Sequence, residues 1–196
     1  MVLTKPVVNL RAQPEINTAT LPAGSTDNPL QITQLLLGEH IIAHEEFIDS
    51  TDTKWLRINT LQQEYFYEPL LWHGYPGWIQ ADDAIPVQNF PTYNLAVKSY
   101  TAYLYDEQMT KVQTLSIGTR LYGEDYSDSL YKVTLPDRST AFIKTNDVYF
   151  IDGTIQESAE TLRSSIIEST QKFLNNWYCW GGRSAQCEDF ELSSVD

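Results

Sequence analysis

The residues near the carboxyl end of the chain have the types and spacing that a binding or catalytic site needs. Tyr178 is followed at short range by Trp180, by the pair Gly181-Gly182 and by Arg183. Paired glycines let a backbone come close to a ligand, and aromatic neighbours exclude water. A tight turn beneath a core tryptophan uses the same residues, so this segment alone leaves both roles open.

Two cysteines, Cys179 and Cys187, are the thiols that could act as nucleophiles. Cys187 is followed by Glu188 and Asp189, whose negative charges disfavour the thiolate form that attacks a substrate. Two cysteines are also too few for a disulfide framework or a zinc site. We therefore expect free thiols or one local pair.

The three histidines do not suggest a metal site. His40 and His44 are four residues apart in a predicted strand, which separates them by about 13 Å, too far to share one ion. His73 stands alone in an aromatic segment. We expect all three to be ordinary surface residues.

A helix precedes the aromatic segment and would position it. The period changes to a helical one after Gly153, which predicts a helix from Ile155 to Leu174. Thr154 and Glu157 fit a capping box at its start. The predicted apolar face comprises Ala159, Leu162, Ile166, Thr170, Phe173 and Leu174.

Upstream of the helix, the same order of short strands occurs twice, and Gly38 and Gly118 mark the same turn in each copy. The first copy comprises residues 7–11, 35–42, 54–58 and 77–85, and the second comprises 101–105, 115–121, 130–134 and 141–148. The high aromatic content and scattered Gly and Pro also favour short strands, so we expect a mainly β protein.

Alternation within these strands predicts which side chains form the core. In the third strand of the first copy, period-two alternation places Leu56 and Ile58 inward and Trp55 and Arg57 outward.

The first copy contains an insert, residues 61–76, that the second lacks. Its aromatic residues are Tyr65, Phe66, Tyr67, Trp72 and Tyr75. Large aromatic side chains are costly to leave in water, so the insert should pack on something. Docking against the second copy or against the carboxyl-terminal segment is favoured over direct substrate contact, although both can hold.

The net charge of −13 argues against two classes of partner, because it repels a nucleic acid backbone and an anionic lipid surface. No apolar stretch has the length of a signal peptide or a membrane span. We expect a cytoplasmic protein, or a periplasmic or extracellular one if a leader is missing.

These features together resemble the NlpC-type cell-wall cysteine peptidases, which are papain-like. In that family a helix leads to a Tyr-x-Trp-Gly-Gly turn, which Tyr178 to Gly182 matches, and two bacterial SH3-like barrels precede it. The resemblance implies SH3-like domains at 1–88 and 89–152, the second degenerate, and part of an α+β peptidase domain at 153–196. It covers only about forty residues of the catalytic domain.

The resemblance also assigns roles to residues. Tyr178 and Asp196 would be active-site neighbours, with Asp196 at the place just before the nucleophilic cysteine. Cys179 falls at a variable, usually apolar position, and the nucleophile and its histidine base are not among the 196 residues. Six residues would contribute to substrate binding: Trp180, Gly181, Gly182, Arg183, Trp72 and Tyr75.

The function implied is that of a γ-D-glutamyl-diamino-acid endopeptidase, which cuts peptidoglycan stem peptides without a metal or cofactor. In members with these barrels, one barrel favours short peptides with a free N-terminal L-Ala, which implies wall-peptide recycling. We expect a monomer that binds a peptidoglycan-derived peptide, and no hydrolysis by these 196 residues alone. The alternative is a non-catalytic pair of SH3-like domains that binds wall peptides.

Overall fold

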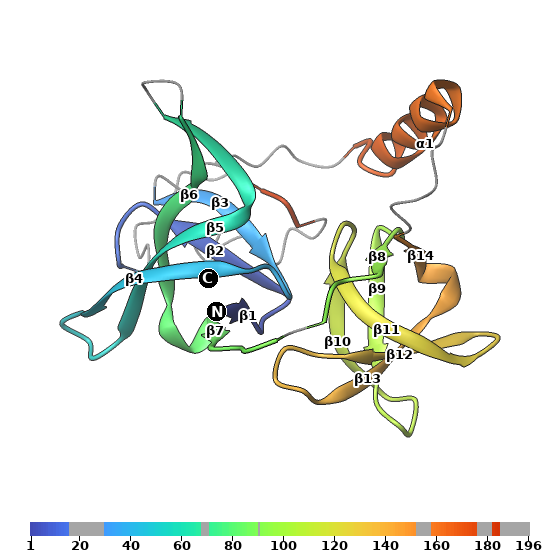
Figure 1. Cartoon of the computed structure of the whole chain (residues 1–196), viewed down its shortest axis with the longest axis horizontal. Helices are drawn as coiled ribbons and strands as arrows, with labels where there is room; N and C mark the ends of the chain where they lie inside the picture. The colour runs from blue at the N-terminus through green and yellow to red at the C-terminus, as the bar shows by residue number, and fades with distance from the viewer. Residues whose placement is uncertain (16–29, 68–70, 90, 152–157, 176–181, 185–196) are drawn as a thin grey trace. The chain divides into compact units, whose positions relative to one another are not determined.

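The computed structural model describes residues 1–15, 30–67, 71–89, 91–151, 158–175 and 182–184. The chain forms two compact units, one of Met1–Phe90 with Tyr178–Asp196 and one of Pro91–Trp177. Strands dominate both units (Figure 1), and every pairing between the described strands is antiparallel. The mainly β fold class is confirmed.

The first unit holds seven strands in a curved five-stranded sheet, ordered β3-β2-β6-β5-β4, and a two-stranded β1-β7 pair. A 3-10 turn at Ala81–Asp83 joins β6 to β7. The strands are β1 (Val2–Leu3), β2 (Val7–Arg11), β3 (Gln31–Leu36), β4 (Ile41–Ile48), β5 (Lys54–Tyr67), β6 (Leu71–Gln80) and β7 (Ala84–Ile85).

The second unit repeats this arrangement in one sheet, ordered β10-β9-β13-β12-β11-β8-β14. A 3-10 turn at Thr145–Asp147 joins β13 to β14, as its counterpart does in the first unit. The strands are β8 (Leu95–Val97), β9 (Thr101–Tyr105), β10 (Lys111–Ser116), β11 (Arg120–Ser127), β12 (Leu130–Thr134), β13 (Thr140–Lys144) and β14 (Val148–Phe150).

The two copies agree residue by residue at the turn that the glycines mark. Gly38 and Gly118 have φ of 83° and 88°, a region that favours glycine, as predicted. Each lies two residues after the end of its preceding strand, β3 or β10. Arg11 pairs with Trp78 in the first copy, and Tyr105 pairs with Phe142 in the second. Positions in one barrel can therefore be matched to positions in the other.

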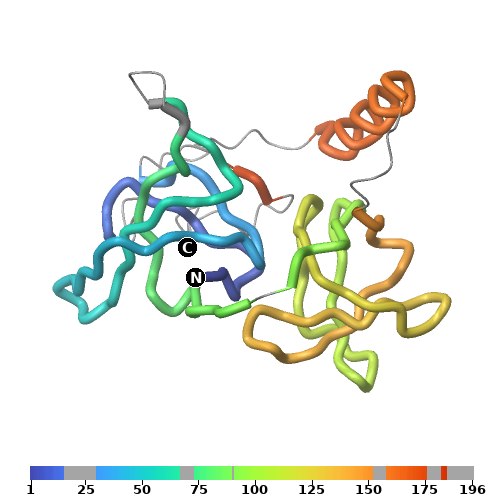
Figure 2. Tube along the Cα trace, in the orientation of Figure 1, coloured from blue at the N-terminus to red at the C-terminus, as the bar shows by residue number. Residues whose placement is uncertain are grey.

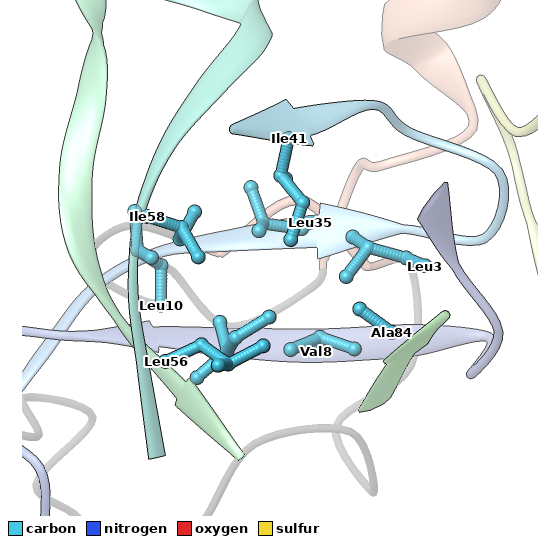
Figure 3. Packing of buried hydrophobic residues seen from close by; sticks show 9 residues of the cluster. Leu3, Val8, Leu10, Leu35, Ile41, Leu56, Ile58 and Ala84 are labelled. Atoms are coloured by element: carbon cyan, nitrogen blue, oxygen red, sulfur yellow. The ribbon is translucent and has the colours of Figure 1, made fainter. Parts of the chain in front are cut away.

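The core of the first unit lies inside its curved sheet (Figure 3). Leu56 and Ile58 are buried there, as the alternation predicts, while the Arg57 side chain is exposed. Each such aliphatic side chain contributes about 1.5–3 kcal/mol when it is buried. The cluster comprises Leu3, Val8, Leu10, Leu35, Ile41, Leu56, Ile58, Ile79 and Ala84.

The outward placement predicted for Trp55 is wrong, because this side chain is fully buried. Its indole Nε1 donates a hydrogen bond of 2.9 Å to Asp49 Oδ2 in the β4–β5 turn. The Arg11 guanidinium lies 5.7 Å from the ring centroid. Alternation places Trp55 on the outward face of β5, but at this position the outward face is covered as well.

Helix α1 (Ala159–Gln171) is shorter than the sequence predicts. Its N-cap is Ser158, whose hydroxyl accepts a hydrogen bond of 3.1 Å from the Thr161 N–H. The expected capping box at Thr154 and Glu157 lies outside the described residues. Exposed apolar side chains on and just after the helix are Leu162, Ile166, Ile167, Phe173 and Leu174.

The carboxyl end of the helix is attached to the second barrel. Phe173 packs edge-on against Tyr100, with ring centroids 5.5 Å apart. Lys172 Nζ donates to the Lys98 carbonyl over 2.9 Å. No helix within the described ranges is long and apolar enough to cross a membrane.

Candidate functional site

The predicted insert, residues 61–76, is a direct continuation of β5 and β6. The two strands remain paired through Tyr65 and His73 as far as Tyr67 and Leu71. In Figure 2 the hairpin rises as one arm from the first unit. The insert is therefore a β-hairpin that takes its direction from the barrel strands.

The base of this hairpin is fixed by hydrogen bonds around a β-bulge in β5. The register shifts between Asn59 and Glu64. Asn59 Nδ2 donates to the Gly74 carbonyl over 2.8 Å, and the Tyr75 N–H donates to Thr60 Oγ1 over 2.8 Å. A Cβ at Gly74 would lie 1.6 Å from the Thr60 carbonyl oxygen, so the two backbones cross closer than any other residue type allows.

A groove of about 430 Å³ opens beside the hairpin base. Its aromatic wall is the pair Tyr65 and Tyr75, whose ring centroids are 4.7 Å apart and tilted by 51°. The lining residues are Ile32, Asn59, Tyr65, His73, Tyr75 and Pro76. With one amide, one imidazole and otherwise mostly apolar surface, the groove suits a small peptide or amide group.

A second feature of the first unit holds residues 182–184, at the end of the Tyr-x-Trp-Gly-Gly motif; we call this segment the turn. The Gln34 side chain is fully buried, and its Oε1 accepts hydrogen bonds of 2.9 Å from both the Arg183 and the Ser184 N–H groups. Gln34 Nε2 donates to Asn9 Oδ1 over 3.0 Å. Because only the carboxamide oxygen can accept from two N–H groups, these bonds fix which way the amide points.

The Arg183 side chain extends the same contact. Its Nη1 lies 2.6 Å from Glu39 Oε1 and 3.3 Å from the Gln34 carbonyl oxygen. Gln63, in the β5 bulge, donates to the Gln34 carbonyl over 2.9 Å and to Glu39 Oε2 over 3.3 Å. Side-chain exposure is 13% for Glu39 and 34% for Arg183, so the ion pair is partly shielded from water. We call Asn9, Gln34, Glu39 and Gln63 the Gln34 socket.

The structure places four of the predicted site residues. Tyr75 lines the groove, Trp72 pairs through its backbone with Phe66 in the hairpin, Gly182 is exposed, and Arg183 is held by the socket. Tyr75 and Arg183, both predicted to bind substrate, thus lie at two different places, the groove and the socket. The positions of Tyr178, Trp180, Gly181, Asp196 and both cysteines lie outside the described residues.

Sequence reasoning missed three groove residues and the socket. Ile32 lies before the predicted strand stretch 35–42, Asn59 directly follows the stretch 54–58, and the sequence predicts an ordinary surface position for His73. Burial of the His40 ring lowers its pKa, and the positive amino terminus adds to this effect. Among the described residues, no three His, Cys, Asp or Glu side chains gather into a metal site.

Comparison with known proteins identifies the type of the second barrel. Residues 97–150, which span most of the second barrel, match the family model of the YKFC SH3b2 domain. The second barrel is therefore an SH3-like domain, similar to the SH3b2 domain of that family model. The barrel of the first unit repeats the strand order of this SH3-like domain.

The fold of nearly the whole chain also has a solved counterpart. It is similar to the crystal structure of an NlpC/P60 family protein from Bacillus cereus ATCC 10987, with a TM-score of 0.64 and 22% sequence identity. The match covers 94% of this chain and 66% of that one, so the chain spans just under two thirds of its neighbour's length. No curated protein is significantly similar to the chain in sequence.

Proposed function

We propose that the chain is the substrate-restricting and turn-positioning part of a peptidoglycan stem-peptide hydrolase, a γ-D-glutamyl-diamino-acid endopeptidase. The observation that carries the proposal is the seating of Arg183 and Ser184 on the buried Gln34 carboxamide. In the peptidase family that the carboxyl end resembles, this turn precedes the nucleophile. We therefore propose that the first barrel, whose buried Gln34 binds this turn, is a structural part of the peptidase.

The contact argues against an independent binding module. A barrel that acted alone would gain nothing from placing a fully buried side chain against residues about 150 positions away in the sequence. Burying a carboxamide is unfavourable unless its hydrogen bonds are made. The turn supplies two of those bonds, so the socket fits a chain in which barrel and turn work together.

The groove supports a short peptide as the substrate class. Tyr65 and Tyr75 form a wall that suits small apolar side chains, and Asn59 and His73 offer polar groups for a peptide backbone. We propose that it restricts the substrate to peptides with a free N-terminal L-Ala, and hence that the protein recycles wall fragments. The hairpin that carries this wall is absent from the second barrel.

The test uses the enzyme that contains this chain, with L-Ala-γ-D-Glu-diaminopimelate and its N-acetylated form as substrates. We expect hydrolysis of the free peptide and much slower hydrolysis of the acetylated one. Tyr75→Ala and Trp72→Ala should each lower kcat/KM for the free peptide. The loss of transition-state stabilisation calculated from kcat/KM should exceed the loss of unfolding free energy. Tyr126→Ala is the matched control, since Tyr126 is an exposed tyrosine of the second barrel.

Two results would overturn the proposal. The first is equal kcat/KM for the two substrates. The second is peptide binding with no hydrolysis by the complete protein, which would favour a non-catalytic module. The coding sequence after Asp196 gives an independent check, because the proposal expects Cys-Ser-Gly there and a histidine further on.

A further inference from the structure

The Gln34 socket is chemically specialised, and the second barrel shows what the fold uses without it. Gln34 pairs with Asn9 across β3 and β2, while the matching pair in β10 and β9 is Thr114 with Tyr103. Both pairs lie at the same distance from the turn glycine. A carboxamide at this position is therefore not required to build the barrel.

The other socket positions show the same difference. Glu39 directly follows Gly38, and Thr119 directly follows Gly118 in the second barrel. Thr119 is fully buried and its hydroxyl donates locally to the Ser116 carbonyl over 2.8 Å, whereas Glu39 reaches Arg183. Gln63 lies in the hairpin insert, which the second barrel lacks. Asn9, Gln34 and Glu39 thus differ in residue type from their counterparts in the second barrel, and Gln63 has no counterpart there.

We infer that Gln34 is a positioning residue, which fixes the Gly182–Ser184 turn so that the active site built after it has its working geometry. This inference rests on the proposed function. Gln34 Oε1 accepts hydrogen bonds from two consecutive backbone N–H groups, which sets the orientation of the peptide unit between Arg183 and Ser184. Arg183 and Glu39 add a side-chain contact that resists rotation about this point.

The mechanism is control of backbone geometry near the reacting atoms. A displacement of about 1 Å at an active site costs on the order of 100-fold in rate, even when its cause is remote. Gln34 contacts no substrate in this scheme and acts only through the turn. Its loss should therefore lower kcat and leave KM for a bound peptide nearly unchanged.

The first experiment measures the contact in the chain itself. Trypsin cleaves after Arg183, and release of the peptide 184–196 can be followed by mass spectrometry. Cleavage after Lys172, the C-cap of α1 in the second unit, serves as the reference in the same digest. Gln34→Thr, which installs the residue of the second barrel, should raise the ratio of Arg183 to Lys172 cleavage by roughly tenfold or more.

Two further variants keep this measurement decisive. Thr114→Ala in the second barrel is the matched control and should leave the ratio unchanged. If Gln34→Thr fails to fold, Glu39→Gln tests the same socket, because it removes the charge that Arg183 contacts and keeps the side chain's size. Unchanged cleavage at Arg183 in a folded socket variant overturns the inference.

The second experiment measures catalysis in the enzyme that contains the chain. Gln34→Thr should lower kcat by about tenfold or more with little change in KM, and Gln34→Asn should not restore it, because its carboxamide is one bond shorter. Faster cleavage at Arg183 with unchanged kcat would show a merely structural contact and overturn the positioning role. If the wild-type enzyme has no peptidase activity, the proposed function fails, while the proteolysis result still stands.

Discussion

Replacing Gly74 with alanine tests the crossing on which the groove is built. The Cβ of an alanine at this position would lie 1.6 Å from the Thr60 carbonyl oxygen and 2.8 Å from its carbonyl carbon. Both are backbone atoms, so no side-chain rotation can relieve the contact. The strands must separate by about 1.4 Å to restore a tolerable distance, and the groove residue Tyr75 must move with them.

The expected cost follows from the contacts that this separation breaks. Two hydrogen bonds cross at this point, from Asn59 to the Gly74 carbonyl and from Tyr75 to Thr60. Each contributes about 0.5–1.5 kcal/mol, and overpacking costs about 1–3 kcal/mol. We expect Gly74→Ala to lower the free energy of unfolding of the first unit by about 3 kcal/mol, which is roughly 10–20 °C in Tm.

Intrinsic tryptophan fluorescence, followed through urea and thermal denaturation, gives the assay, because four of the five tryptophans belong to the first unit: Trp55, Trp72, Trp78 and Trp180. Gly123→Ala in the second barrel is the matched control. Its Cβ would meet side-chain atoms of Leu95 at 2.5 Å and Val133 at 3.2 Å and no backbone atom closer than 3.4 Å, so its cost should be smaller and its effect on the unfolding of the first unit negligible. If Gly74→Ala unfolds at the wild-type urea concentration, the strands do not cross as closely as described.

Three further outcomes are expected. Hydrogen bonds, chiefly from the Trp55 indole, lower the pKa of Asp49 to about 2. This carboxylate therefore stabilises the fold fully above about pH 4 and loses that effect as the pH falls through about 2. Asp49→Asn should flatten the plot of unfolding free energy against pH between these values, and parallel plots for the variant and the wild type would contradict the assignment. Limited trypsin digestion should cut first within residues 154–196, after Arg163 and Lys172, because the apolar face of α1 is uncovered; earlier cleavage of the barrels would show that the order of stability is reversed. The purified 196-residue chain should not hydrolyse L-Ala-γ-D-Glu-diaminopimelate, and turnover that disappears when either cysteine is replaced by alanine would contradict this.

Sequence patterns gave the strands and turns because those signals are local. Residues 7–11, 101–105 and 130–134 are strands with the predicted limits, and Gly38 and Gly118 have the predicted positive φ. Such features depend on neighbours within a few residues, which a single sequence displays directly.

The errors and omissions arose where distant parts of the chain decide the outcome. Trp55 is buried because Asp49 and Arg11 cover the face that alternation assigned to solvent. Gln34 meets Ser184 across 150 residues, and no local pattern announces such a contact.

The bulge in β5 gives one short stretch of sequence two separate effects. The Gln63 side chain donates hydrogen bonds from the bulge to Gln34 and Glu39, while Tyr65, two residues later, forms part of the groove wall. Under the proposed function, this one hairpin supplies both the wall that restricts the substrate and a support for the turn before the nucleophile. A homologue that lost this hairpin would have to replace both at once, so selectivity and turn geometry should be gained or lost together.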